Sequence, residues 1–223
     1  MDDRWVKKRV LIVVKTYPTP AMSGVEVSCT AGITENKEWI RIFPVPFRLL
    51  HEDKRFAKYQ WVDVDVTKAV KDFRPESYKL NDQTIQASKL EPSWGSRWKY
   101  IAPLLGKSLC EIQATQKSNG SPTLGIFKPA KIKRLIIEKA NGDWTQSQLN
   151  ALNQSTMFPQ SRPIERLEKI PFDFKYEFLC SAAGCRGHKL SCTDWEIGQA
   201  YRSWQKNIQL VGKRHSESGS RRR

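Results

Sequence analysis

The chain has 223 residues and a formal net charge of +15. This length allows one large domain or two small ones, and the excess of cations favours a polyanionic partner, either nucleic acid or an anionic membrane surface. The one continuous apolar run, Val10–Val14, is far too short to cross a bilayer, and no signal-peptide cleavage site accompanies it. We therefore expect a cytoplasmic protein that binds nucleic acid, DNA or RNA, and no membrane.

Alternating apolar and polar residues predict a β meander in the first half of the chain. The strand patterns lie at residues 9–17, 25–33, 39–43 and 61–67. The segment from 49 to 58 fits either a short helix or a loop. Apolar residues then recur at helical spacing from Trp94 to Leu105, which predicts a helix over residues 93–105 at the end of this half.

Strand patterns resume in the second half, after a turn at residues 119–122. The expected elements are strands at 123–127, 132–137 and 174–179 and a helix at 145–152. The last helix is the most clearly marked, because Thr193 and Glu196 fit the capping-box pattern at its start. Apolar residues follow at helical spacing, so this helix is expected to pack inward.

Two neighbouring segments carry a resemblance to a known family. Cys29–Ile33 and Trp39–Pro44, with the short turn between them, resemble the first hairpin of bacterial dual OB-domain proteins. Leu124–Pro129 fits the start of a second barrel midway along the chain. The resemblance implies two small barrels that bind nucleic acid, with no settled catalytic activity. It does not extend to the cysteine-rich segment or to the terminal helix.

These patterns together predict a mostly β (α+β) protein of OB-like small barrels with flanking helices and a C-terminal strand-loop-helix held by zinc. Residues 1–110 are expected to form a first β-barrel-like half with a closing helix. Residues 111–211 are expected to form a second β-rich half that contains the Cys/His cluster and the terminal helix. Residues 212–223 are a basic tail without the apolar residues needed for folding, and we expect it to be disordered.

Three of the five cysteines and one of the three histidines lie within thirteen residues. They are Cys180, Cys185, His188 and Cys192. Thiolate and imidazole are the ligands that a tetrahedral structural zinc ion selects, and Gly184 and Gly187 suit the tight bends of a metal-binding loop. We predict that these four residues bind zinc. The alternative is a buried strand thiol, two incidental thiols and a surface histidine.

Cations alternate with aromatic residues around the first hairpin. Trp39 and Arg41 share one face of a strand because side chains alternate with period two. The expected nucleic-acid-binding residues are Trp39, Arg41, Arg48, Arg55, Lys58 and Tyr59. Cations neutralise phosphates and aromatic rings stack on bases, as a single-strand-binding surface requires. The alternative is ordinary surface cations above core aromatics.

No catalytic residue is predicted. A metal-dependent nuclease or other nucleic-acid-modifying enzyme is the main alternative to simple binding, with Asp63, Asp65, His188 and Glu196 as candidate residues. Cys29 fits a buried strand thiol better than a nucleophile, because no partner is visible in the sequence. A third alternative is an interaction module within a larger defence or repair complex.

Overall fold

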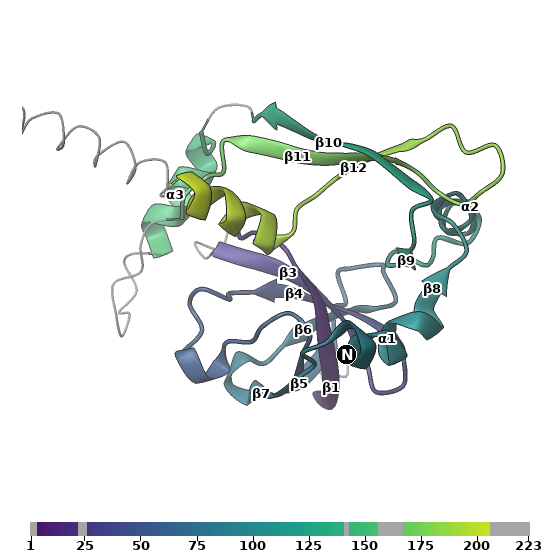
Figure 1. Ribbon diagram of the computed structural model, residues 1–223. Coiled ribbons are helices and arrows are strands. Elements are labelled where there is room, and N and C mark those ends of the chain that lie inside the picture. Colours follow the sequence, from purple (N-terminus) through teal and green to yellow (C-terminus); the bar gives the residue numbers. More distant parts are fainter. Residues whose placement is uncertain (1–3, 22–25, 141–142, 156–166, 206–223) are drawn as a thin grey trace, which may run out of the picture.

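The structure is a computed structural model that describes residues 4–21, 26–140, 143–155 and 167–205 (Figure 1). The basic tail predicted at 212–223 lies outside the described residues. The elements of the first half are β1 (Val6–Lys15), β2 (Thr19–Pro20), β3 (Glu26–Thr34), β4 (Trp39–Val45), β5 (Gln60–Lys68), β6 (Ser77–Leu80), β7 (Gln86–Leu90) and α1 (Trp94–Ile101). Single 3-10 turns lie at Glu52–Lys54, Asp82–Thr84 and Ala102–Leu104.

Five strands of the first half close into a barrel. Their order is β1-β3-β4-β6-β5, and β5 pairs with β1 to complete the ring. After the β1-β3-β4 meander the chain crosses to place β5 beside β1, which is the Greek-key connection. β6 then enters between β5 and β4 and pairs with β4 in parallel. A small five-stranded Greek-key barrel is the architecture of the OB fold, so the predicted mostly β fold with an OB-like barrel and flanking helices is confirmed.

Alternation along the strands separates an interior from an outer face. The interior is filled by aliphatic side chains of β1, β4 and β5, such as Val10, Ile42 and Val64. The alternate residues Leu11 and Ile33 point outward and form a second core with Ile101 of α1. The helix therefore covers part of the outer face of the barrel.

The second half contains two small sheets. Its elements are β8 (Leu105–Gly106), α2 (Leu109–Asn119), β9 (Ile126–Phe127), β10 (Lys131–Lys139), α3 (Gln146–Ser155), β11 (Phe172–Leu179) and β12 (His188–Ser191). β10, β11 and β12 form an antiparallel sheet in that order, and β8 pairs with β9. The expectation of a second barrel is wrong for the described residues, because β10 and β12 do not pair and this sheet stays open.

The end of the second half returns to the barrel. Thr16 forms a β-bridge with Asp194, and the Tyr17 N–H donates to the carbonyl of Thr193. The ammonium of Lys15 lies 3.5 Å from the ring centre of Phe47 and 4.8 Å from that of Trp195. Burial lowers the pKa of Lys15 to about 8. These contacts join β1 to the helix that begins at Trp195.

Two local predictions need correction. The Asp194 carboxylate, and not the Thr193 hydroxyl, accepts the Glu196 N–H at the start of the last helix, because the helix begins at Trp195 and Asp194 is therefore its N-cap residue. Helix α2 was not predicted, since its sequence carries few apolar residues in helical register. No helix within the described residues has the length and apolar character needed to cross a bilayer.

Gly32 provides a test of the barrel packing. A Cβ atom at this position would lie 2.3 Å from Cγ1 of Val10 and 2.6 Å from the carbonyl oxygen of Leu11, so backbone has to move. We expect Gly32→Ala to lower the free energy of unfolding by about 1–3 kcal/mol. Gly95→Ala is the control, because its Cβ meets nothing closer than 3.9 Å and lies in helix α1.

Alanine at position 95 is expected to raise the free energy of unfolding by about 0.5–1 kcal/mol, since glycine is a poor helix former. Urea unfolding followed by circular dichroism measures both variants. Equal midpoints for the parent and Gly32→Ala would contradict the packing described for β1 and β3.

Candidate metal centre and adjoining aromatic cavity

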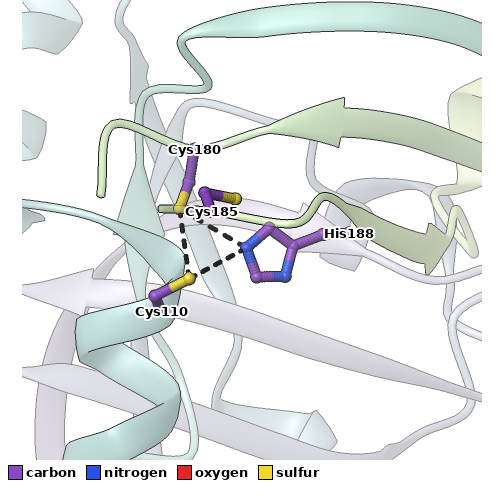
Figure 2. A group of neighbouring side chains, drawn as sticks. All are labelled: Cys110, Cys180, Cys185 and His188. Carbon is purple, nitrogen blue, oxygen red and sulfur yellow. Dashed lines mark hydrogen bonds between the residues drawn. The ribbon is translucent and has the colours of Figure 1, made fainter. Parts of the chain in front are cut away.

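Three cysteines and one histidine meet where helix α2 touches the end of the β10-β11-β12 sheet (Figure 2). Cys110 lies in the first turn of α2, Cys180 directly follows β11, Cys185 is in the next loop, and His188 begins β12. Their ligand atoms all lie within 4.8 Å of one another. A compact Cys3His set of this kind is a candidate metal site.

The separations within the cluster suit a tetrahedral ion. The Cys110 Sγ lies 3.3 Å from the His188 Nε2 and 3.5 Å from the Cys180 Sγ, and the His188 Nε2 lies 3.4 Å from the Cys180 Sγ. Ligand atoms around a tetrahedral zinc ion are separated by about 3.5–3.8 Å, given its bond lengths of about 2.0–2.3 Å. Four protein ligands leave no open coordination position, which is typical of a structural site.

Local sequence explains how the ligands are presented. Ser108 caps α2 by accepting the Glu111 N–H, and Cys110 lies in the first turn of this helix, where backbone N–H groups have no intrahelical partner. Gly184 and Gly187 adopt positive φ angles of 73° and 103° in the loop between Cys180 and His188. The predicted role of these two glycines is confirmed, because other residues adopt such angles only with strain.

The environment of the cluster favours a thiolate at Cys180 and a protonated thiol at Cys110. Burial raises the pKa of the Cys180 thiol, but hydrogen bonds from the backbone N–H groups of Ala182 and Cys110 and from His188 outweigh it and lower the pKa to about 5. The contact with Cys180, reinforced by burial, raises the pKa of Cys110 to about 11. A bound dication would relieve this competition by neutralising both sulfurs.

Aromatic stacking connects the cluster to the rest of the second half. The His188 ring lies 5.5 Å from the ring of Phe178, which in turn lies 5.4 Å from that of Phe127 in β9. Leu109 and Phe178 form a small buried core with Cys180, and Cys110 and Cys185 pack against this core. The candidate ligands are therefore fixed by α2, β9, β11 and β12 together.

The predicted ligand set needs one correction. Cys180, Cys185 and His188 are brought together, but the fourth member is Cys110 and not Cys192. The Cys192 N–H bonds to the carbonyl of Phe174, four residues along β11 from Phe178, which pairs with His188. A strand rise of about 3.3 Å per residue puts Cys192 roughly 13 Å beyond His188. Cys110 was not predicted as a ligand. The sequence signal near it is the Ser108–Glu111 capping pattern, which marks the start of helix α2.

A cavity of about 410 Å³ adjoins this region on the outer face of the barrel. It lies over β1, β3 and β4, and its other wall is the segment 124–129 that contains β9. Five aromatic side chains line it: Trp39, Tyr59, Trp94, Trp98 and Phe127. Trp94 and Trp98 are 65% and 49% exposed. The cavity is thus lined by aromatic rings from both halves of the chain.

The orientation of Tyr59 is fixed by backbone contacts. Tyr59 has a φ of 61°, its N–H donates to the carbonyl of Ile12, and its carbonyl accepts the N–H of Glu91. The guanidinium of Arg97 lies 4.1 Å from the Tyr59 ring centre and 5.6 Å from that of Trp94. Backbone hydrogen bonds and contacts with the Arg97 guanidinium therefore hold these rings at the cavity.

The structure separates the predicted nucleic-acid-binding residues into two groups. Trp39 and Tyr59 share the cavity, whereas Arg48, Arg55 and Lys58 lie in internal contacts. Arg48 pairs with Glu26, Arg55 donates to the carbonyls of Leu50 and Arg48, and Lys58 pairs with Asp194 and Glu196.

Arg41 lies on the same strand as Trp39. Its Nη1 donates to the Cys29 Sγ at 3.4 Å, and its buried Nε has no hydrogen-bond partner among the described residues. The exposed Lys128 at the cavity wall was not predicted, since a single lysine beside a proline carries no distinctive pattern. Trp94 and Trp98 were predicted as members of one apolar helix stripe, and in the structure they are exposed residues of helix α1 that line the cavity.

The candidate residues for a nuclease do not come together. Asp63 and Asp65 lie on β5 opposite Arg9 and Lys7 of β1, and Asp194 and Glu196 hold Lys58. Across the described residues, the Cys3His cluster is the one group of three or more side chains placed to bind a metal ion.

Comparison with known families divides the chain at the same place as the fold. The domain of unknown function DUF8757 matches residues 105–216, half of the 223-residue chain. The chain belongs to the DUF8757 family. A second domain of unknown function, DUF8758, matches residues 6–103. The DUF8757 segment contains all four residues of the cluster, and the DUF8758 segment contains the barrel. No curated protein and no solved structure matches the chain.

Metal content distinguishes Cys110 from Cys192 as the fourth ligand. We expect about one equivalent of divalent metal per chain in protein purified without chelator, because a closed Cys3His site binds tightly. Cys110→Ser should lose most of this metal, and Cys192→Ser should retain it. Elemental analysis measures both. Loss of metal in Cys192→Ser with retention in Cys110→Ser would contradict the described ligand set.

Proposed function

We propose that this protein binds single-stranded nucleic acid on the outer face of its barrel and that its Cys3His cluster holds a structural zinc ion. The observation that carries the proposal is the position of the aromatic cavity over β1, β3 and β4. In OB folds the face formed by the second and third barrel strands binds oligonucleotides. β3 and β4 occupy that position here.

The cavity has the size and lining that a nucleobase requires. A volume of about 410 Å³ lies in the range of small-ligand sites, and planar rings from both walls offer stacking surfaces. Base stacking on aromatic side chains contributes about 1–3 kcal/mol per base and tolerates any sequence. Binding of single strands without strict sequence preference follows from this lining.

Charge supports a polyanionic ligand. The chain carries a net charge of +15, and the exposed Lys128 lies at the cavity wall. The resemblance of the β3–β4 hairpin to dual OB-domain proteins supports the same function. Arg48, Arg55 and Lys58 contribute less directly than we expected from the sequence, because their charged groups are used within the protein.

Zinc is the metal that best fits the cluster. Three sulfurs and one imidazole nitrogen form a soft donor set, and zinc accepts tetrahedral geometry without redox chemistry. Its role would be to fasten α2 to the ends of β11 and β12. This position also fixes the β9 wall of the cavity through the stacked rings of Phe127 and Phe178.

The binding proposal is tested by titrating fluorescently labelled single- and double-stranded oligonucleotides at two salt concentrations. We expect single strands to bind more tightly and affinity to fall as salt rises, because phosphate contacts release counterions. Trp94→Ala should weaken single-strand binding by roughly 5- to 150-fold, which corresponds to about 1–3 kcal/mol of stacking.

Trp204→Ala is the matched control, because Trp204 is also 65% exposed but lies in the last helix and outside the cavity. It should leave affinity unchanged. Absence of binding at low salt, or equal losses in the two variants, would refute the proposal. The same samples with added magnesium or manganese test for cleavage, and turnover by the parent protein would favour the nuclease alternative.

A further inference from the structure

The β10-β11-β12 sheet has an uncovered apolar face. Leu135, Tyr176 and Leu190 lie in one row across the three strands, and Ile137 lies two residues further along β10 on the same side. These four residues, the inner sheet face, are 43%, 38%, 39% and 56% exposed in that order. Side chains of this kind are usually buried, so the exposure indicates an interaction surface.

The opposite face of the same sheet is polar and internally paired. Glu138 of β10 pairs with Lys175 of β11 and Lys189 of β12, and Glu177 pairs with Arg134 and Lys133. The charges on this outer face satisfy one another across neighbouring strands. The inner sheet face is therefore the side on which a ligand finds unsatisfied apolar surface.

The inner sheet face is turned toward the body of the protein. Phe174 and Phe178 share this face with Tyr176, because side chains alternate along β11. Phe178 packs beside Leu109 and Phe127 at one end, and Phe174 lines a cavity with Tyr17 and Pro18 at the other. Figure 1 shows the sheet passing over β3 and β4 between these two anchored ends.

This arrangement restricts what can reach the inner sheet face. The two anchors are four residues apart on β11, which is about 13 Å. The barrel lies on the side that this face is turned toward, which hinders the approach of a globular partner. The side chains of the face are 38–56% exposed, so an extended single chain can reach them.

Charge indicates which kind of chain binds here. Lys139 at the end of β10 pairs with Phe172 and lies on the inner sheet face, and Lys128 follows Phe127, which stacks on Phe178 at the other end of that face. Both lysines are exposed and have no acidic partner among the described residues, so they offer phosphate contacts near the two ends of the inner sheet face. A polyanion satisfies these cations, whereas a neutral peptide does not.

We propose that a single strand of nucleic acid whose base occupies the aromatic cavity continues beneath the β10-β11-β12 sheet, where Tyr176 stacks on a second base. This inference rests on the proposed function and extends its binding path. Leu135 and Leu190 flank Tyr176 in its row and give the stacked base an apolar surround. The sheet thereby acts as a clamp over the strand.

The test compares affinity for single strands of increasing length, from about 4 to about 16 nucleotides, the range of OB-fold site sizes. Short strands that fill only the cavity should bind the parent and Tyr176→Ala equally. Longer strands should gain affinity with the parent and lose at least about fivefold with Tyr176→Ala. Tyr176→Phe should restore the gain, because it keeps the ring.

Ile136→Ala is the control on the opposite face of the same sheet and should behave as the parent. An equal length gain in the parent and Tyr176→Ala would overturn the clamp, while Trp94-dependent binding of short strands would leave the proposed function standing. No binding of any strand would remove both. Self-association of the parent that Tyr176→Ala abolishes would assign the inner sheet face to a second copy and overturn the proposal.

Discussion

The second half of this protein depends on how four soft side chains from distant parts of the chain are held together. Cys110 precedes Cys180 by 70 residues, yet their sulfurs lie 3.5 Å apart. Deprotonation of both sulfurs would place two negative charges side by side in a partly buried cluster, and a bound cation would neutralise them. Packing alone stabilises the β10-β11-β12 sheet weakly, because three strands with one uncovered face bury little apolar surface. A metal ion bound at this point would supply stability that packing does not.

A row of stacked aromatic rings connects the candidate metal centre to the proposed binding site. His188 stacks on Phe178, Phe178 stacks on Phe127, and Phe127 lines the aromatic cavity. The barrel supplies the opposite wall from its own core, with Trp39 packed against the Ile33 cluster. The cavity therefore needs both halves of the chain: a barrel that folds by strand closure and a smaller unit held by the candidate metal centre.

Sequence patterns predicted the parts of the structure that local chemistry determines. Period-two alternation located β1, β3, β4 and β5, and the spacing of Cys180, Cys185 and His188 identified most of the cluster. Contacts between segments far apart in the sequence could not be predicted from such local patterns. Cys192 is close to His188 in sequence but extends away from it along β12, while Cys110 arrives on a helix with a weak apolar pattern.

The same limit applies to charge. Arg48, Arg55 and Lys58 look like surface cations in the sequence, and only the folded chain brings Glu26, Asp194 and Glu196 to two of them. Trp94 and Trp98 have the spacing of an apolar helix stripe, but the barrel and segment 124–129 leave a cavity in front of them.

Amide hydrogen exchange before and after treatment with a metal chelator tests most directly whether the second half depends on a bound metal. We expect protection to fall in α2, β11 and β12 while the barrel strands β1, β3 and β5 stay protected. Unchanged protection throughout the metal-free protein would contradict the claim that the second half depends on a bound metal.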